Sequence, residues 1–244
     1  MTTKAEFFDR LRAEIVRARE LFPARLSERP AQPGLLLDTL RRELSERWPE
    51  TLERFRLEFE RVAGVFHRVS HITDVAPVIG AIASQRGAQR LVSWHPRALG
   101  AELGGALAGQ GLQVDVMPGE PVNEGRPELR ERIAAGEIGL TGVDVAIAET
   151  GSLVLVSGVG RPRSTALLPP CHVAVFDRTA LVESLQQMGL VLEVWHAGTA
   201  AERGAAIHII TGPSRTADIE LTLTRGVHGP GEVHAIFVDR PWHG

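Results

Sequence analysis

Residues 91–118, LVSWHPRALGAELGGALAGQGLQVDVMP, decide the fold. The segment begins with the short apolar run LVSW and ends with LQVDVMP at 112–118, and both runs have the composition of β-strands. Between them, PRALGAELGGALAGQG has the apolar spacing of a helix. A strand, a helix and a second strand in this order predict neighbouring parallel strands joined by a helical crossover.

The same alternation extends along the rest of the chain. The stretch DVAPVIGAIASQRG before this segment and the stretches ELRERIAAG and TALVESLQQMG after it are typical of helices, whereas VDVAIA, SLVLV, HVAVF, AIHIIT and EVHAIFVD are typical of strands. We therefore predict an α/β domain with a largely parallel sheet. In such a sheet the ligand crevice lies beyond the carboxyl ends of the strands.

The first 65 residues differ from the rest in charge density. They hold 25 of the 57 charged residues of the chain, beside apolar residues at helical spacing. ARLSERPAQPG at 24–34 is typical of a linker between helices, and Trp48-Pro49 indicates a kink or restart. We predict an N-terminal helical extension over residues 1–65 and an α/β domain over residues 66–244. The extension is either a set of helices packed on a neighbour or an arm that binds a partner.

Composition excludes several classes of function. A formal net charge of −3 provides no overall basic field for nucleic acid, so we expect no nucleic-acid partner. No apolar run approaches the roughly 20 residues that a membrane span needs. The start, MTTKAEFFDRLRAE, has charges where a signal peptide would be apolar. We expect a cytoplasmic protein without a membrane span.

The rare residues limit the chemistry further. Cys171 is the only cysteine, so the chain by itself cannot form a disulfide or hold an iron–sulfur cluster. Tyrosine is absent, and Lys4 is the only lysine. An anion site must therefore use arginine side chains, backbone N–H groups or hydroxyls.

The stretch TGVDVAIAETGSL at 141–153 places Glu149 at the end of a predicted strand. Thr150 and Gly151 then turn the chain back into SLVLV, which predicts a hairpin, and glycine suits a turn that needs positive φ. Glu149 is either an exposed turn carboxylate or a nucleophile or base at the strand end.

The stretch SGVGRPRSTALLPPCH at 157–172 contains two arginines beside flexible glycines. Gly158 and Gly160 make only half of a dinucleotide-binding motif, and Pro162 removes an N–H group where a phosphate-binding helix would begin. Arg161 and Arg163 can instead clamp a carboxylate or phosphate. The alternative is a solvated loop.

The stretch TGPSRTADIE at 211–220 follows the apolar run AIHII and precedes ADIELTL, which we predict to be helical. A loop between a strand and a helix offers free N–H groups to an anion. The candidate anion-binding residues in this loop are Thr211, Gly212, Ser214, Arg215 and Thr216. The alternative is a helix cap with spare hydroxyls.

The stretch GVHGPGEVH at 226–234 contains three potential metal ligands, His228, Glu232 and His234. Their spacing matches no standard metal site, so we expect no metal. His228 lies in the loop and is a candidate crevice residue, while His234 lies in a strand and is expected to pack. We expect the turn at residue 149, the arginines at 161–163 and the loop at 211–216 to face one composite site.

Four of these stretches together resemble a known family. AIAETGSLVLVSG, RPRSTALLPPCHVAV, ITGPSRTADIE and GVHGPGEVHAIFV follow, in this order, the pattern of the LUD domain family, most closely its lactate utilisation protein C branch. The resemblance covers about residues 70–240. It implies a fold like that of the NagB/RpiA/CoA-transferase group, in agreement with the alternating pattern.

The resemblance also implies a function. It implies a cytoplasmic subunit that oxidises L-lactate to pyruvate together with two partner proteins. The iron–sulfur clusters belong to the partners in that family, so we expect no cofactor on this chain.

Two mechanisms stay open. In the first, the chain is a subunit whose arginine and hydroxyl loops hold a small organic acid or contact the partners. In the second, it is an autonomous enzyme that resembles a CoA transferase or an isomerase and uses Glu149, because related CoA transferases carry a nucleophilic glutamate at a strand-end turn.

Overall fold

The computed structural model of the chain describes residues 6–10, 12–13, 30–121, 125–198, 204–217, 223–226 and 228–242. Its centre is a six-stranded sheet in which every pair of neighbouring strands is parallel. The strand order is β1 (Val65–Val69), β12 (Glu232–Val238), β7 (Cys171–Asp177), β4 (Ile138–Gly142), β2 (Arg90–Ser93) and β3 (Gln113–Val116). The predicted α/β class with a largely parallel sheet is confirmed.

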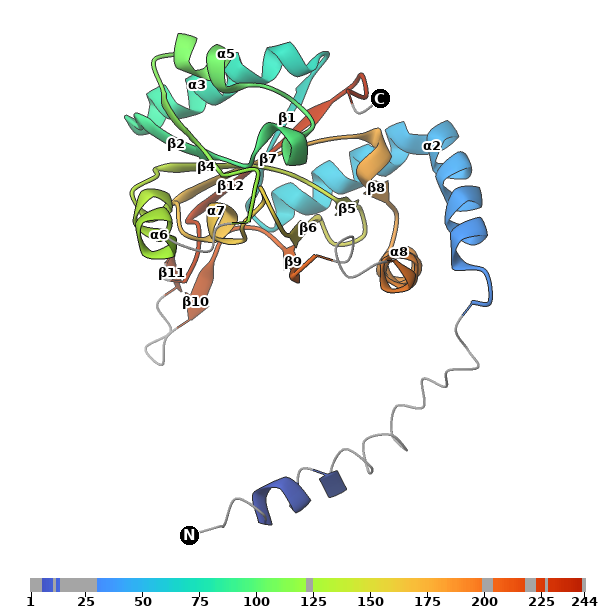
Figure 1. Cartoon of the computed structure of the whole chain (residues 1–244). Helices are drawn as coiled ribbons and strands as arrows, with labels where there is room; N and C mark the ends of the chain where they lie inside the picture. Colours follow the sequence, from blue (N-terminus) through green and yellow to red (C-terminus); the bar gives the residue numbers. More distant parts are fainter. Residues whose placement is uncertain are drawn as a thin grey trace.

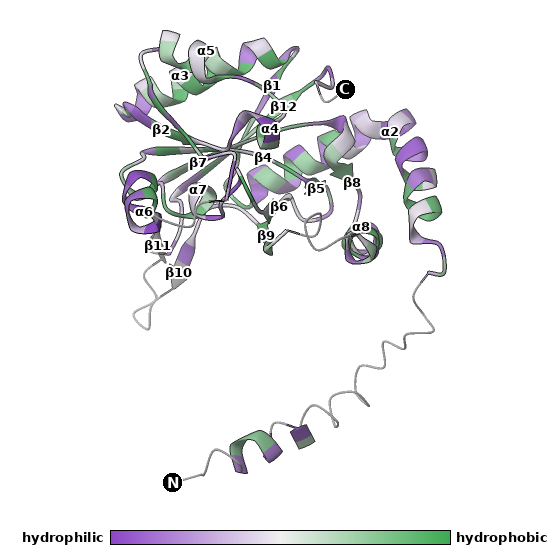
Figure 2. Cartoon of the chain, in the orientation of Figure 1, coloured by the Kyte–Doolittle hydropathy of each residue, from purple (hydrophilic) through white to green (hydrophobic). Residues whose placement is uncertain are grey.

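Helices and a second sheet cover the two faces of this main sheet (Figure 1). Helices α3 (Val75–Arg86) and α5 (Gly104–Gly109) pack on one face, against residues such as Leu91, Ile138 and Val173. The other face carries the second sheet together with α2 (Pro33–Arg61), α6 (Arg126–Ala134) and α7 (Ser164–Leu167). Figure 2 shows hydrophobic residues concentrated along the main sheet and in the helices that cover it.

The second sheet contains four strands and lies against the main one. Its order is β8 (Leu181–Val182), β5 (Val145–Ile147), β6 (Ser152–Ser157) and β9 (Ala206–Ile210). Strands β5 and β6 are antiparallel, so the hairpin predicted around Gly151 is confirmed. Strand β9 runs antiparallel to β6, with Leu153 opposite Ile210 and Ser157 opposite Ala206.

Helix α2 forms the described part of the predicted N-terminal extension. It is bent at Arg47, just before Pro49, as the Trp48-Pro49 pair indicated. After the bend, Phe55 and Phe59 are fully buried and pack against Phe176 and Phe237 of the main sheet. The second half of α2 is therefore part of the core rather than a separate arm.

Two predicted helices differ from the structure. The helix expected over 179–189 begins only at Leu185 and forms α8 (Leu185–Ala197). The preceding residues form a 3₁₀ turn (Arg178–Ala180) capped by the Asp177 carboxylate, which accepts a hydrogen bond from the Thr179 N–H, and then β8, which pairs with β5. The chain cannot satisfy these bonds and be helical at the same time.

The helix expected at ADIELTL is wrong as well. Strand β10 (Arg215–Ala217) pairs antiparallel with β11 (Leu223–Arg225), and Thr216 lies opposite Thr224. Threonine favours strands because of its β-branch. The loop at 211–216 therefore leads into a hairpin, so the helix N-terminus on which its anion site depended is missing from the described residues.

Two short elements complete the carboxyl side of β2 and the start of α3: α4 (Pro96–Leu99) and a 3₁₀ turn at Ile72–Asp74. In the part of the chain that the structure describes, no helix has the length and apolar character needed to cross a membrane.

Candidate functional site

Glu149 lies in the turn between β5 and β6 and is exposed. One of its carboxylate oxygens accepts a hydrogen bond of 2.8 Å from the N–H of Leu185, the first residue of α8. Its own N–H donates to the carbonyl of Glu183 at 3.0 Å. A carboxylate at this position satisfies a free N–H group and interacts favourably with the helix dipole. In this structure Glu149 caps a helix.

The residues after Glu149 are bound to the loop at 211. The hydroxyl of Ser152 lies 2.7 Å from that of Thr150 and 2.7 Å from that of Thr211. Gly151 has a φ of 60°, and a Cβ at this position would lie 2.3 Å from the backbone nitrogen of Phe59. Only glycine lets the turn approach α2 this closely.

The 211–215 loop packs on the end of the same helix. The Arg215 guanidinium donates to the carbonyl of Val62 at 2.8 Å, and a Cβ on Gly212 would lie 2.4 Å from that carbonyl oxygen. The Ser214 N–H donates to Pro230 at 2.8 Å, which ties the loop to the segment that contains the exposed His228. The side chain of Thr216 lies outside the described residues.

We call the residues Glu149–Gly151 and Thr211–Arg215 the turn cluster. Its polar groups bind other parts of the same chain: the start of α8, the end of α2 and each other. The described contacts of the turn cluster are those of a junction between elements.

Arg161 has a different position and a similar fate. Its guanidinium forms an ion pair with Asp144 at 3.0 Å, and the other oxygen of Asp144 accepts from the Val156 N–H at 2.7 Å. Burial raises the pKa of Asp144, although the Val156 N–H and the Arg161 charge oppose this. Arg161 therefore holds its own loop in place.

The predicted residues do not form one composite site. The turn cluster lies at the Ser152 end of β6, whereas Arg161 and Arg163 follow its Ser157 end. Five residue steps separate these ends, which is about 17 Å at about 3.4 Å per residue. The expectation of one crevice was wrong because a strand, and not a turn, separates the two groups.

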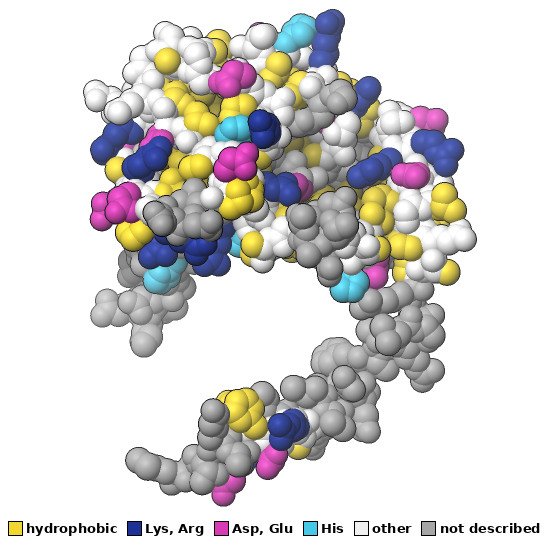
Figure 3. Space-filling view, viewed as in Figure 1, with side chains coloured by type: hydrophobic (Ala, Val, Ile, Leu, Met, Phe, Trp, Pro, Cys, Tyr) yellow, Lys and Arg dark blue, Asp and Glu magenta, His cyan; other side chains and the backbone are white. Residues whose placement is uncertain are grey.

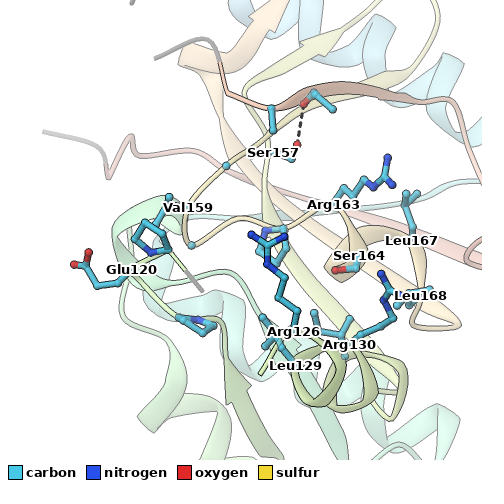
Figure 4. Close-up of a pocket in the computed structure, with 18 residues that line it drawn as sticks. Glu120, Arg126, Leu129, Arg130, Ser157, Val159, Arg163, Ser164, Leu167 and Leu168 are labelled. Carbon is cyan, nitrogen blue, oxygen red and sulfur yellow. Dashed lines mark hydrogen bonds between the residues drawn. The ribbon is translucent and has the colours of Figure 1, made fainter. Parts of the chain in front are cut away.

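Arg163 instead lines a pocket of about 1020 Å³ at the Ser157 end (Figure 4). We call it the arginine pocket. Its walls come from the end of β3, from α6, from the loop between β6 and α7, from α7 and from the start of β9. The lining residues used below are Glu120, Arg126, Leu129, Arg130, Ile133, Ser157, Val159, Arg163, Ser164, Leu167 and Leu168.

The charges of this lining are unbalanced. Three arginines, Arg126, Arg130 and Arg163, face one acid, Glu120, so the pocket is cationic in a chain whose formal net charge is −3. Figure 3 shows basic side chains gathered between α6 and the β10–β11 hairpin. The pocket can therefore attract and hold an anion.

Sequence analysis found Arg163 but missed Arg126 and Arg130. In the sequence these two belong to RPELRERIA, which has the mixed charges of an ordinary exposed helix. Their spacing of four residues places both on one side of α6, but a sequence does not show that this side faces a cavity.

A separate cluster lies at the opposite, amino end of the main sheet. Within the described residues, ligand atoms of Cys171, Glu232 and His234 lie within 4.8 Å of one another, and His228 is not among them. Glu232 forms an ion pair with Arg86, while burial raises the pKa of the Cys171 thiol to about 12. A protonated thiol and a carboxylate already paired with arginine are poor metal ligands. The absence of a metal stays a prediction.

Comparison with known proteins places the chain among relatives. The lactate utilization protein C of Halalkalibacterium halodurans is 38% identical over 111 residues, which are 46% of this chain and 48% of that protein. The protein of the same name from Macrococcus caseolyticus is 38% identical over 106 residues, 42% of this chain and 44% of the relative. The chain thus spans about half the length of the curated relatives it matches.

One solved structure supports the fold. A DUF162 family protein from Deinococcus radiodurans aligns with a TM-score of 0.52 and 21% identity, over 78% of this chain and 97% of that one. The model of the LUD domain matches residues 52–238, which include the second half of α2 and all six strands of the main sheet. These matches confirm the resemblance drawn from the four stretches, and the chain belongs to the LUD domain family.

Proposed function

We propose that this chain is the anion-binding subunit of a cytoplasmic system that oxidises L-lactate to pyruvate together with iron–sulfur partner proteins. The observation that carries the anion-binding part is the arginine pocket, in which three arginines face one glutamate. The pathway is supported by relatives named lactate utilization protein C.

The partner part of the proposal is supported by cysteine chemistry. Iron–sulfur clusters are usually held by several cysteine thiolates, and this chain has only Cys171. Cys171 is fully buried in β7, and burial raises the pKa of its thiol to about 12, so the thiolate required for ligation is not formed near neutral pH. Electrons therefore pass through cofactors on the partners.

The alternative of an autonomous transferase or isomerase has less support. A nucleophilic carboxylate needs to reach a bound substrate. Glu149 binds the Leu185 N–H and lies at the far end of β6 from the arginine pocket.

A growth experiment tests the proposal. A strain that lacks this chain should fail to grow on L-lactate and grow normally on glucose, and the full chain should restore growth. Arg130→Glu should fail to restore it, because the substitution reverses one of the three positive charges of the pocket. Arg178→Glu makes the same charge change at an exposed position outside the pocket and should restore growth. Normal growth of the deletion strain on L-lactate would reject the proposed role.

A further inference from the structure

The arrangement of the three arginines limits the shape of the anion. Arg126 and Arg130 project from α6 one helical turn apart, and Arg163 enters from the loop before α7 (Figure 4). Like charges at this helical spacing repel by roughly 0.2–0.5 kcal/mol. A ligand with several negatively charged oxygens would relieve this repulsion by binding both side chains together.

The number of charges favours a polyanion over a monocarboxylate. The carboxylate of lactate has two oxygens and can engage one guanidinium in a bidentate pair. The remaining two arginines would then be left without a ligand group in the pocket. A diphosphate has more charge and more oxygens, and it can bridge α6 and the α7 loop. With one glutamate against three arginines, its negative charge matches the excess positive charge of the lining.

The apolar walls indicate that the ligand also has an organic body. Leu129 and Ile133 of α6 face the pocket from one side, and Leu167 and Leu168 from the other. The volume of about 1020 Å³ lies at the upper end of the roughly 300–1,000 Å³ typical of pockets for drug-sized ligands. An inorganic anion or lactate would leave most of this volume and these side chains in contact with water.

The loop that carries Arg163 is held in place before any ligand binds. Gly158 and Arg161 exchange backbone hydrogen bonds of 3.1 and 3.2 Å, and the His95 N–H donates to Gly160 at 2.8 Å. The ion pair between Arg161 and Asp144 adds a side-chain contact to the neighbouring strand. Preorganisation of this kind lowers the entropy cost of binding.

We propose that the arginine pocket binds an organic diphosphate of nucleotide size, with the diphosphate on Arg126, Arg130 and Arg163 and an apolar ring system between α6 and α7. This inference deepens the proposed function and rests on the arginine pocket as its ligand site. Arginine suits both halves of such a ligand, because its guanidinium pairs with phosphate oxygens and stacks on aromatic rings.

Isothermal titration calorimetry of the full chain in a phosphate-free buffer tests this proposal. The probes are ADP, pyrophosphate, adenosine and L-lactate. We expect ADP to bind most tightly, with pyrophosphate and adenosine each at least about tenfold weaker, because each lacks one half of the ligand. L-lactate should produce no saturable signal at millimolar concentration. Equal affinities for ADP and L-lactate, or no binding of ADP, would overturn the inference. Pyrophosphate binding as tightly as ADP would overturn the role of the apolar walls.

Matched variants identify the site. The double variant Arg130→Gln/Arg163→Gln should weaken ADP binding at least about tenfold, because a hydrogen bond to a charged group contributes roughly 1.5–3 kcal/mol. The control Arg54→Gln/Arg178→Gln removes the same charge from exposed positions outside the pocket and should leave affinity unchanged. Equal losses in both variants would mean unspecific attraction. Growth on lactate tests the pathway and calorimetry tests the pocket, so either proposal can fail without the other.

Discussion

The two ends of β6 use polar residues in opposite ways. At the Ser152 end, Glu149, Ser152 and Arg215 bind helix ends and hydroxyls of the same chain. At the Ser157 end, Arg163 joins the arginines of α6 around an open volume of about 1020 Å³. Clustered polar residues therefore indicate a binding site only when their groups face space that a ligand can fill.

The largest expected effect concerns the main sheet that both ends share. His172 is fully buried in β7, its Nε2 lies 2.9 Å from the Thr141 hydroxyl, and burial, followed by the charge of His234, lowers its pKa from 6.5 to about 3. The unfolded chain takes up this proton first as the pH falls. The stability due to neutral His172 is complete above about pH 6.5 and is lost toward about pH 3, which amounts to the order of 5 kcal/mol.

Urea unfolding at about pH 7 and about pH 4 measures this loss. His172→Gln can keep the hydrogen bond to Thr141 without a titratable group, so its stability should fall less between the two pH values. Far-UV circular dichroism and tryptophan fluorescence should report one transition. If acid unfolds only one end of β6, the two ends are independent units and do not rest on a common sheet. An equally steep pH dependence in the variant would show that other groups carry the effect.

The next largest effect belongs to the turn cluster. Gly151→Ala should destabilise the protein by at least about 3 kcal/mol, since alanine resists positive φ and its Cβ overlaps the backbone. That Cβ would lie 2.3 Å from the backbone nitrogen of Phe59. Gly189→Ala is the matched control, because Gly189 lies inside α8 with nothing within 4 Å of its Cβ position. The control should stabilise by roughly 0.5–1 kcal/mol. Denaturant unfolding measures both variants, and a neutral Gly151→Ala would mean that the turn does not pack on α2.

The sequence predicted the fold better than the site, for physical reasons. The strands LVSW and HVAVF are apolar and β-branched, so their burial on both faces of a parallel sheet was readable. Strand β4, IGLTG, was missed because glycines dilute its apolar pattern. In the structure, Gly139 is needed because a Cβ there would lie 1.9 Å from the Thr165 carbonyl oxygen, where α7 crosses the strand.

The candidate site required distances that a single sequence does not contain. TGPSRTADIE has the composition of an anion-binding loop, yet Arg215 is bound to the end of α2 and β10 replaces the expected helix. Arg130 has the composition of a surface residue and lines the pocket. Only the packing of α6 beside α7 separates these two cases.

The smallest expected effect decides between a cap and a catalytic residue at Glu149. Glu149→Ala should cost about 1 kcal/mol of stability, because it removes an acceptor and a negative charge at the start of α8. Glu149→Gln should cost about half as much, since its amide oxygen can still accept from the Leu185 N–H, whose hydrogen bond to the carboxylate is 2.8 Å long. Neither variant should change ADP binding, and Glu149→Gln should restore growth on L-lactate. If Glu149→Gln is as stable as the wild type and abolishes growth, the carboxylate acts chemically, and the contrast between the two ends of β6 fails at this residue.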